Sequence, residues 1–159
     1  MSKWIERKRK INPDYTWFDL KIIRSQIHHR GVFAAQDIPA RRYVMEYTGE
    51  IRNRAQAKKY HARAPERDLI YIWEIPSKRY HISYWELDGF IGGSGAELVN
   101  HSCDPNLYPI FCGKRLYYVS SRKIKKGEEL TISYGEGYFT SRSLECVCNS
   151  ELCFEDKER

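Results

Sequence analysis

The chain has 159 residues, which favours a single domain with enough length to bury a sizeable core. Hydrophobic residues make up 42% and charged residues 30%, a balance typical of a globular protein rather than a disordered one. No apolar run approaches the roughly 20 residues of a membrane-spanning helix, and the basic N-terminus lacks the apolar stretch of a signal peptide. The composition therefore argues against membrane, secreted and fibrous proteins.

The charge is unevenly placed along the chain, whose formal net charge is +6. Residues 1–67 hold 16 Lys/Arg and 7 Asp/Glu, a balance of +9, whereas residues 68–159 hold 11 and 14, a balance of −3. Such a chain can turn a basic surface toward nucleic acid and an acidic surface toward a Lys/Arg-rich peptide. A solvated surface without any partner explains the same pattern, so the charge alone does not choose between them.

Turn residues punctuate the chain at short intervals, and short β-prone segments lie between them. The expected strands cover residues 18–23, 32–35, 43–47, 69–75, 80–82, 116–119 and 130–133. One helix is predicted over residues 53–64, which are rich in alanine and long polar side chains and precede Pro65. Residues 97–100 add at most one helical turn. The pattern predicts a mainly β protein with little helix.

A glycine-rich run, residues 91–95, is unsuited to the interior of a strand or helix. It is either a flexible hinge or a place where the backbone approaches a ligand closely. No Gly-Lys-Ser/Thr follows it, which excludes a phosphate-binding loop of that type.

The five cysteines indicate a metal site. Cys146, Cys148 and Cys153 form a Cys-x-Cys-x4-Cys motif, and three thiolates so close in sequence can converge on one tetrahedral Zn²⁺. The fourth ligand must come from elsewhere; Cys103 and Cys112 both lie in turns. An odd cysteine count argues against a set of disulfides, and free thiols are the remaining alternative. A metal would fix the polar C-terminal segment to the body of the protein.

Four motifs resemble, in order, those of SET-domain lysine methyltransferases. They are Arg-Gly-Val-Phe-Ala at residues 30–34, Glu-Tyr-Thr-Gly-Glu at 46–50, Asn-His-Ser-Cys-Asp-Pro-Asn at 100–106 and Gly-Glu-Glu-Leu-Thr-Ile-Ser-Tyr-Gly at 127–135. The cysteine tail looks like the post-SET zinc motif of the same family. Together the matches extend over about residues 16–154, and their combination is far more specific than any one of them.

The resemblance implies a SET-domain fold of small β-sheets around a knot-like C-terminal threading. It divides the chain into a basic segment (1–15), a SET domain (16–137) and a post-SET zinc-binding tail (138–159). It also implies S-adenosylmethionine as methyl donor, with cofactor and lysine meeting through a narrow channel. Two positions depart from the family pattern: His29 replaces a loop glycine, and Glu97 stands where an arginine is common.

The resemblance also assigns roles to individual residues. Tyr134 and Tyr47 are expected to be catalytic, because a tyrosine gives a channel an apolar wall and a hydroxyl that accepts from an amine. The implied cofactor-binding residues are His29, Arg30, Gly31, Tyr71, Asn100, His101, Tyr134 and Phe154. The implied zinc ligands are Cys103, Cys146, Cys148 and Cys153, which leaves Cys112 free. Ile132 is expected to influence how many methyl groups are added.

The sequence therefore predicts a protein-lysine N-methyltransferase that uses S-adenosylmethionine and Zn²⁺ and acts on a lysine-containing protein, with a histone tail as one candidate. The alternative is a non-catalytic, zinc-bearing module that binds nucleic acid or chromatin. The expected nucleic-acid contact lies in the basic N-terminal half and includes Lys3, Arg7, Lys8, Arg9 and Lys10. The expected location is intracellular, and nuclear if the source is eukaryotic.

Overall fold

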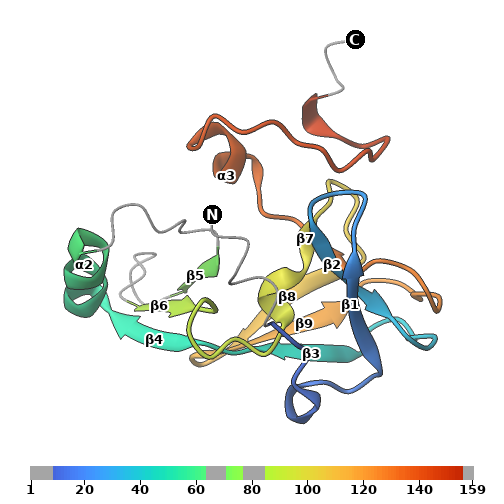
Figure 1. Ribbon diagram of the computed structural model, residues 1–159, viewed down its shortest axis with the longest axis horizontal. Helices are drawn as coiled ribbons and strands as arrows, with labels where there is room; N and C mark the ends of the chain where they lie inside the picture. The colour runs from blue at the N-terminus through green and yellow to red at the C-terminus, as the bar shows by residue number, and fades with distance from the viewer. Residues whose placement is uncertain (1–8, 64–70, 77–84, 156–159) are drawn as a thin grey trace.

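The computed structural model describes residues 9–63, 71–76 and 85–155 (Figure 1). The strands are β1 (Leu20–Arg24), β2 (Arg30–Ala34), β3 (Tyr43–Tyr47), β4 (Glu50–Asn53), β5 (Ile72–Ile75), β6 (Trp85–Asp88), β7 (Asn100–His101), β8 (Leu107–Cys112), β9 (Arg115–Ser120) and β10 (Thr131–Ile132). The helical elements are α2 (Arg54–Arg63), α3 (Glu136–Thr140), and the 3-10 turns η1 (Pro13–Tyr15) and η3 (Ala96–Leu98). The described chain is mainly β with little helix, as predicted.

Small sheets, rather than one large sheet, make up the described β structure. Strands β1 and β2 form an antiparallel hairpin, β3, β9 and β8 form one three-stranded sheet, and β4, β6 and β5 form another. Their inner faces share one core, in which Val32, Met45, Leu116, Ile124 and Leu130 are fully buried. No helix among the described residues is long and apolar enough to cross a membrane.

A two-residue parallel pair, β7 with β10, brings together two motifs that lie about 30 residues apart in sequence. Asn100 is opposite Thr131 and His101 is opposite Ile132. The Ser102 amide extends the pairing by donating to the Ile132 carbonyl at 3.0 Å. Both strands are buried, so this small sheet fixes the two motifs against each other inside the protein.

Several predicted elements match the structure and others were missed. Strand β3 has the predicted bounds, and α2 matches the predicted helix to within a residue at its start. The predicted strand at 80–82 and part of the one at 69–75 lie outside the described residues. Strands β4, β6 and β8 and helix α3 were not predicted.

Strands β4 and β6 were not predicted because both contain charged residues. These two strands pair through Arg52, which lies opposite Glu86 and is 2% exposed. Its guanidinium contacts Glu86 at 2.5 Å and also Asp88, so buried charges of opposite sign are matched across the pair. A polar pattern normally indicates a solvated segment. Here the charges occur in a sheet because each has its partner on the neighbouring strand.

The glycine-rich run at 91–95 serves a close approach within the chain. The Asn12 amide donates to the Ser94 carbonyl at 2.9 Å, so the N-terminal segment crosses directly over the run. A Cβ at Gly95 would lie 2.9 Å from the Lys10 carbonyl, and a Cβ at Gly93 would lie 2.5 Å from the Glu97 carboxylate. The close approach is to this chain's own residues, so the two expectations from sequence, a hinge or a close approach to a ligand, stay predictions.

Candidate functional site

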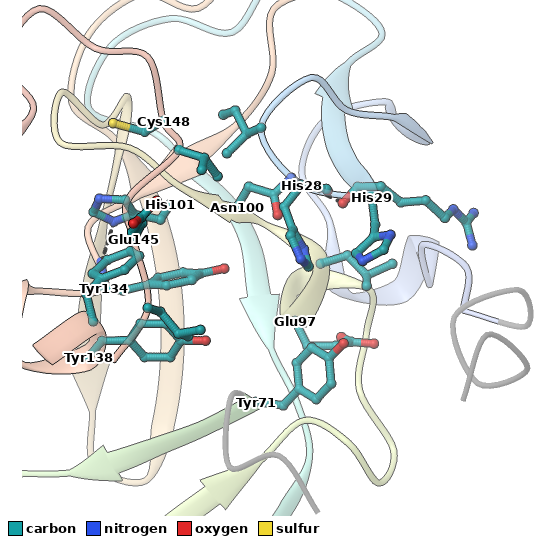
Figure 2. Close-up of a pocket in the computed structure, with 16 residues that line it drawn as sticks. His28, His29, Tyr71, Glu97, Asn100, His101, Tyr134, Tyr138, Glu145 and Cys148 are labelled. Carbon is teal, nitrogen blue, oxygen red and sulfur yellow. Dashed lines mark hydrogen bonds between the residues drawn. The ribbon is translucent and has the colours of Figure 1, made fainter. Parts of the chain in front are cut away.

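Two cavities lie next to each other and share three wall residues, Glu97, Tyr134 and Tyr138. The first is lined by Ile27, His28, His29, Arg30, Tyr71, Leu98, Asn100, His101, Phe139, Leu144, Glu145, Val147 and Cys148 besides the shared residues (Figure 2). The second is lined by Tyr47, Ile72, Trp73, Glu74, Ala96, Val99, Tyr118, Ile132, Gly137 and Arg142 besides the shared residues. Two ligands can therefore approach one junction from separate openings.

Asn100 holds the loop that borders the first cavity. Its side-chain amide donates to the carbonyls of His28 and Arg30, both at 3.2 Å, and to Glu129 Oε1 at 2.8 Å. Glu129 also accepts a hydrogen bond from the Ser25 hydroxyl at 2.9 Å. The buried strand β7 thus fixes the loop between β1 and β2. Sequence analysis did not assign Glu129 to the site.

His29 replaces a glycine of the family pattern but keeps a glycine-like backbone, with φ of 40°. This left-handed conformation costs a non-glycine residue roughly 1–2 kcal/mol. The ring of His29 packs edge-on against His28, with ring centroids 4.1 Å apart. The loop therefore keeps the turn that a glycine would give it, and it adds imidazole groups at the cavity wall (Figure 2).

His101 links the first cavity to Tyr134. Its Nδ1 accepts a hydrogen bond from the Tyr134 amide at 3.0 Å, so this nitrogen carries no proton. Burial lowers the pKa of His101, which favours the neutral ring that this hydrogen bond requires. Its Nε2 faces the Cys103 sulfur at 3.2 Å. One imidazole thereby connects the tyrosine at the cavity junction with the cysteine cluster.

Tyr134 stands between the two cavities, and its hydroxyl has a fixed direction. The hydroxyl donates to the Val99 carbonyl at 2.7 Å, which leaves the oxygen lone pairs available to an incoming donor. Burial, with smaller contributions from Tyr138, Tyr71 and Glu129, raises the pKa of Tyr134 well above its usual value. The phenol is therefore neutral throughout the physiological range.

The second cavity has a wall of closely packed aromatic rings. Tyr47 and Tyr118 are 3% and 1% exposed, with ring centroids 5.9 Å apart. The Tyr47 hydroxyl donates to the Tyr71 carbonyl at 2.6 Å, and the Trp73 indole donates to the Tyr118 hydroxyl at 3.1 Å. Burial raises the pKa of both tyrosines. The hydroxyls of Tyr47 and Tyr118 and the Trp73 indole are thus hydrogen-bonded within the wall, while Glu74, Glu97 and Arg142 supply charged groups elsewhere around the same cavity.

The cysteine cluster lies beside the first cavity. The ligand atoms of His101, Cys103, Cys146 and Cys148 all lie within 4.8 Å of one another. Cys153 is buried, and its side chain contributes to the raised pKa of Cys146. Cys112 is exposed at the end of β8. Three of the four expected zinc ligands therefore meet directly with an unexpected histidine, and the fourth is adjacent.

This donor set fits Zn²⁺. The Cys103 and Cys146 sulfurs are 3.8 Å apart, close to the edge of a tetrahedron with Zn–S bonds of about 2.3 Å. Burial raises the pKa of Cys103 to about 11, and it also raises the pKa of Cys146. Burial acts in the same direction on Cys148, but hydrogen bonds from the Cys103 and Ser150 amides outweigh it, so the pKa of Cys148 is lowered. Buried thiols that resist ionisation on their own need a cation to become thiolates.

Most residues expected at the cofactor site do border the first cavity: His29, Arg30, Tyr71, Asn100, His101 and Tyr134. Gly31 and Phe154 are not among its wall residues. Gly31 packs against Glu129 and Asn100, and Phe154 packs against the ring of Phe139. Tyr47 and Ile132 line the second cavity.

Sequence analysis missed several wall residues that follow Tyr134. Tyr138, Phe139, Leu144 and Val147 all border the first cavity. The available signal was the density of apolar side chains in an otherwise polar segment.

Comparisons with known proteins agree with this geometry. Residues 29–135 match the model of the SET domain family. A histone-lysine N-methyltransferase trithorax from Drosophila virilis is 31% identical over 137 residues, which cover 83% of this chain and 3% of that protein. The histone-lysine N-methyltransferase EHMT1 from Mus musculus is 30% identical over 162 residues, covering 96% of this chain and 12% of that protein. The chain thus spans a small fraction of the length of these relatives.

Proposed function

Because the chain belongs to the SET-domain family, we propose that it is a protein-lysine N-methyltransferase that takes its methyl group from S-adenosylmethionine. The observation that best supports this proposal is the shared wall of the two cavities, at which Tyr134 lies between them. Methyl transfer to an amine is an in-line displacement, so donor and acceptor must approach the methyl carbon from opposite sides. Two cavities that meet at one tyrosine suit this requirement.

The second cavity is the proposed channel for the substrate lysine. The aromatic rings of Tyr47, Trp73 and Tyr118 give part of this channel an apolar wall, which disfavours the ammonium form that must lose its proton before the nitrogen can attack. Tyr134 donates its own hydroxyl proton to Val99, so its oxygen accepts from the amine and directs the nitrogen lone pair toward the first cavity. Tyr47 confines the side chain of the substrate, and its hydroxyl is held by Tyr71.

The first cavity is the proposed cofactor site. The cofactor supplies an activated methyl group on a sulfonium. The side chain of Asn100 holds the loop carbonyls of His28 and Arg30, which aims the backbone of that loop at the cavity. The ring of Tyr71 and the apolar side chains of the tail give the cavity flat walls suited to an adenine ring. Phe154 supports this wall through Phe139.

We assign Cys103, Cys146, Cys148 and Cys153 to one Zn²⁺, with Cys112 free. His101 is a competing ligand because its Nε2 belongs to the same cluster. Its Nδ1 is engaged by the Tyr134 amide, so a metal bound at Nε2 would also hold the catalytic tyrosine.

The proposed substrate is a lysine-containing protein, and a histone tail suits the acidic balance of residues 68–159. The names of the relatives give histone lysine as their target. We also propose that the basic N-terminal half contacts nearby nucleic acid. A histone substrate implies an intracellular protein, nuclear if the source is eukaryotic.

The experiment that tests the function begins with cofactor binding. Calorimetry on the zinc-loaded chain should detect binding of S-adenosylmethionine, and the ligand should raise the thermal midpoint. Radiolabelled methyl transfer onto purified histones and onto a lysate of the source cells then identifies acceptors. No heat and no thermal shift at millimolar cofactor would overturn the proposal in favour of a binding module.

A further inference from the structure

A buried ion pair joins the N-terminal segment to the junction of the two cavities. The Arg9 guanidinium contacts Glu97 Oε1 at 2.6 Å, and the two side chains are 9% and 2% exposed. Arg9 also donates to the Gly89 and Phe90 carbonyls, and it lies 4.6 Å from the centroid of the Tyr71 ring. Arg9, which the sequence analysis expected to contact nucleic acid, is thus directed inward.

Glu97 places a carboxylate in the wall that the two cavities share. Its side chain lines both cavities, and Figure 2 shows it beside Tyr71, across the first cavity from Tyr134 and Tyr138. Its other oxygen, Oε2, accepts a hydrogen bond from the Gly95 amide at 2.8 Å. Arg9 is therefore the cation that balances this carboxylate in the described part of the chain.

A net negative charge at this junction would work against the methyl transfer proposed above. As the reaction proceeds, the nitrogen lone pair forms a bond to the methyl carbon while the methyl–sulfur bond breaks, sulfur keeps its electron pair, and positive charge passes from sulfur to nitrogen. A negative charge beside both atoms would stabilise the sulfonium and the methylated ammonium product, but it would also hold the proton on the substrate amine. Because the amine must lose that proton before it can attack, the charge opposes transfer.

We propose that Arg9 neutralises Glu97, so that the junction of the cavities carries no net negative charge when the cationic cofactor and the lysine meet there. This inference rests on the proposed function. It also accounts for one departure from the family pattern: an acidic residue at position 97 is compatible with methyl transfer because the N-terminal segment supplies a cation.

Other charged and titratable groups near the junction do not replace Arg9. Tyr71, Tyr134 and Tyr138 line the first cavity with Glu97, as do His28, His29, Arg30, His101, Glu145 and Cys148. Tyr47 from β3, Tyr118 from β9, Glu74 and Arg142 line the second. Among the described residues, Arg9 is the cation whose ion pair with Glu97 is established. Burial raises the pKa of Tyr47 and Tyr118, and the charge of Glu97 raises both further, so its field reaches the aromatic wall. Arg142 is occupied elsewhere, donating to the Tyr138 carbonyl at 3.2 Å.

The test compares two ligands of nearly the same shape and different charge. S-adenosylmethionine is a sulfonium cation at sulfur, whereas S-adenosylhomocysteine is a neutral thioether. In Arg9→Met, the uncompensated carboxylate should raise the preference for the cation over the thioether by about tenfold, measured by calorimetry. In Glu97→Gln, the uncompensated guanidinium should shift the preference in the opposite direction. The double variant should return to within about twofold of wild type.

Matched variants separate the effect of the positive charge of Arg9 from the effect of its hydrogen bonds to the Gly89 and Phe90 carbonyls. Arg9→Lys keeps the charge but loses the fork that reaches the Gly89 and Phe90 carbonyls, so it should keep the wild-type ligand preference even if its thermal midpoint falls. Arg115→Met removes the same kind of side chain from Glu46, an ion pair outside both cavities. It should leave the preference unchanged.

The pH dependence of methyl transfer gives a second reading. The acid limb of the rate profile should move about one unit toward higher pH in Arg9→Met, because the uncompensated carboxylate favours the ammonium form of the substrate. Opposite shifts of ligand preference in Arg9→Met and Glu97→Gln would support neutralisation of Glu97 by Arg9. Equal weakening of both ligands, or an unchanged preference in a folded Arg9→Met protein, would overturn it. If the wild-type chain bound neither ligand, the proposed function itself would fail.

Discussion

The two cavities differ in what builds them. Strands supply the aromatic and aliphatic part of the second cavity, through Tyr47 of β3, Tyr118 of β9 and Ile132 of β10. Loops and the C-terminal tail supply much of the first, including Leu144, Val147 and Cys148 beside the cysteine cluster. Tail residues beyond Arg142 line only the first cavity. The proposed lysine channel therefore draws on β3, β9 and β10, whereas the proposed cofactor site also depends on tail residues beyond Arg142.

Removing the Tyr134 hydroxyl should have the largest effect on the rate of methyl transfer, because Tyr134 lines both cavities. Tyr134→Phe keeps the ring and removes the hydroxyl, which donates to Val99 and which we propose orients the amine. The rate of methyl transfer should fall by roughly a hundredfold or more, about 3 kcal/mol. Single-turnover kinetics measures this fall, and calorimetry should show cofactor affinity nearly unchanged. A rate within a few-fold of wild type would remove Tyr134 from its catalytic role.

Loss of a cysteine should affect the first cavity selectively. In Cys148→Ser, elemental analysis should find less zinc, and the tail residues next to the cluster should lose their order. Cofactor affinity should then fall by about tenfold, as for a weakened metal site. Cys112→Ser is the matched control, because Cys112 is exposed at the end of β8 and should leave zinc near one ion per chain. Intact protein free of zinc would refute the metal assignment.

The smallest expected effect concerns the second cavity, where the products rather than the rate should change. Ile132 is 1% exposed and carries no hydroxyl, so we expect the wild-type enzyme to add more than one methyl group. A tyrosine hydroxyl at this position can hold a water where a further methyl would go. Ile132→Tyr should shift the products toward monomethyl-lysine in mass spectra, and Ile132→Val should not. A wild-type enzyme that stops at one methyl on every acceptor would contradict this expectation.

Sequence patterns predicted the parts of the site that lie within continuous motifs. Asn100 and His101 belong to one such motif and Tyr134 to another, and the structure brings all three to the first cavity. The strand alternation also indicated that Ile132 and Tyr134 would face the same side, and both line the second cavity. Local sequence was sufficient here because each motif determines its own backbone conformation.

Pairings between distant residues were beyond local patterns. Arg9 and Glu97 lie 88 positions apart, and each looks like an ordinary surface charge until the other is placed beside it. The same holds for Arg52 with Glu86 and Asp88. His101 was assigned to the cofactor site, but its second nitrogen belongs to the cysteine cluster. Only the fold shows that one ring has two neighbours of different chemistry.

The short β7–β10 pair has a consequence for how the protein folds. Two residues on each strand cannot hold a parallel pair by themselves, and the intervening chain of about 30 residues, which includes β8 and β9, must be ordered before the loop-closure entropy is recovered. We therefore expect the pair to form late, after the β3–β9–β8 sheet. A nascent or partly unfolded chain has Asn100 and Tyr134 but no junction between the cavities. Hydrogen exchange at the Ser102 amide, which bonds to Ile132, should accordingly report the global unfolding of the domain.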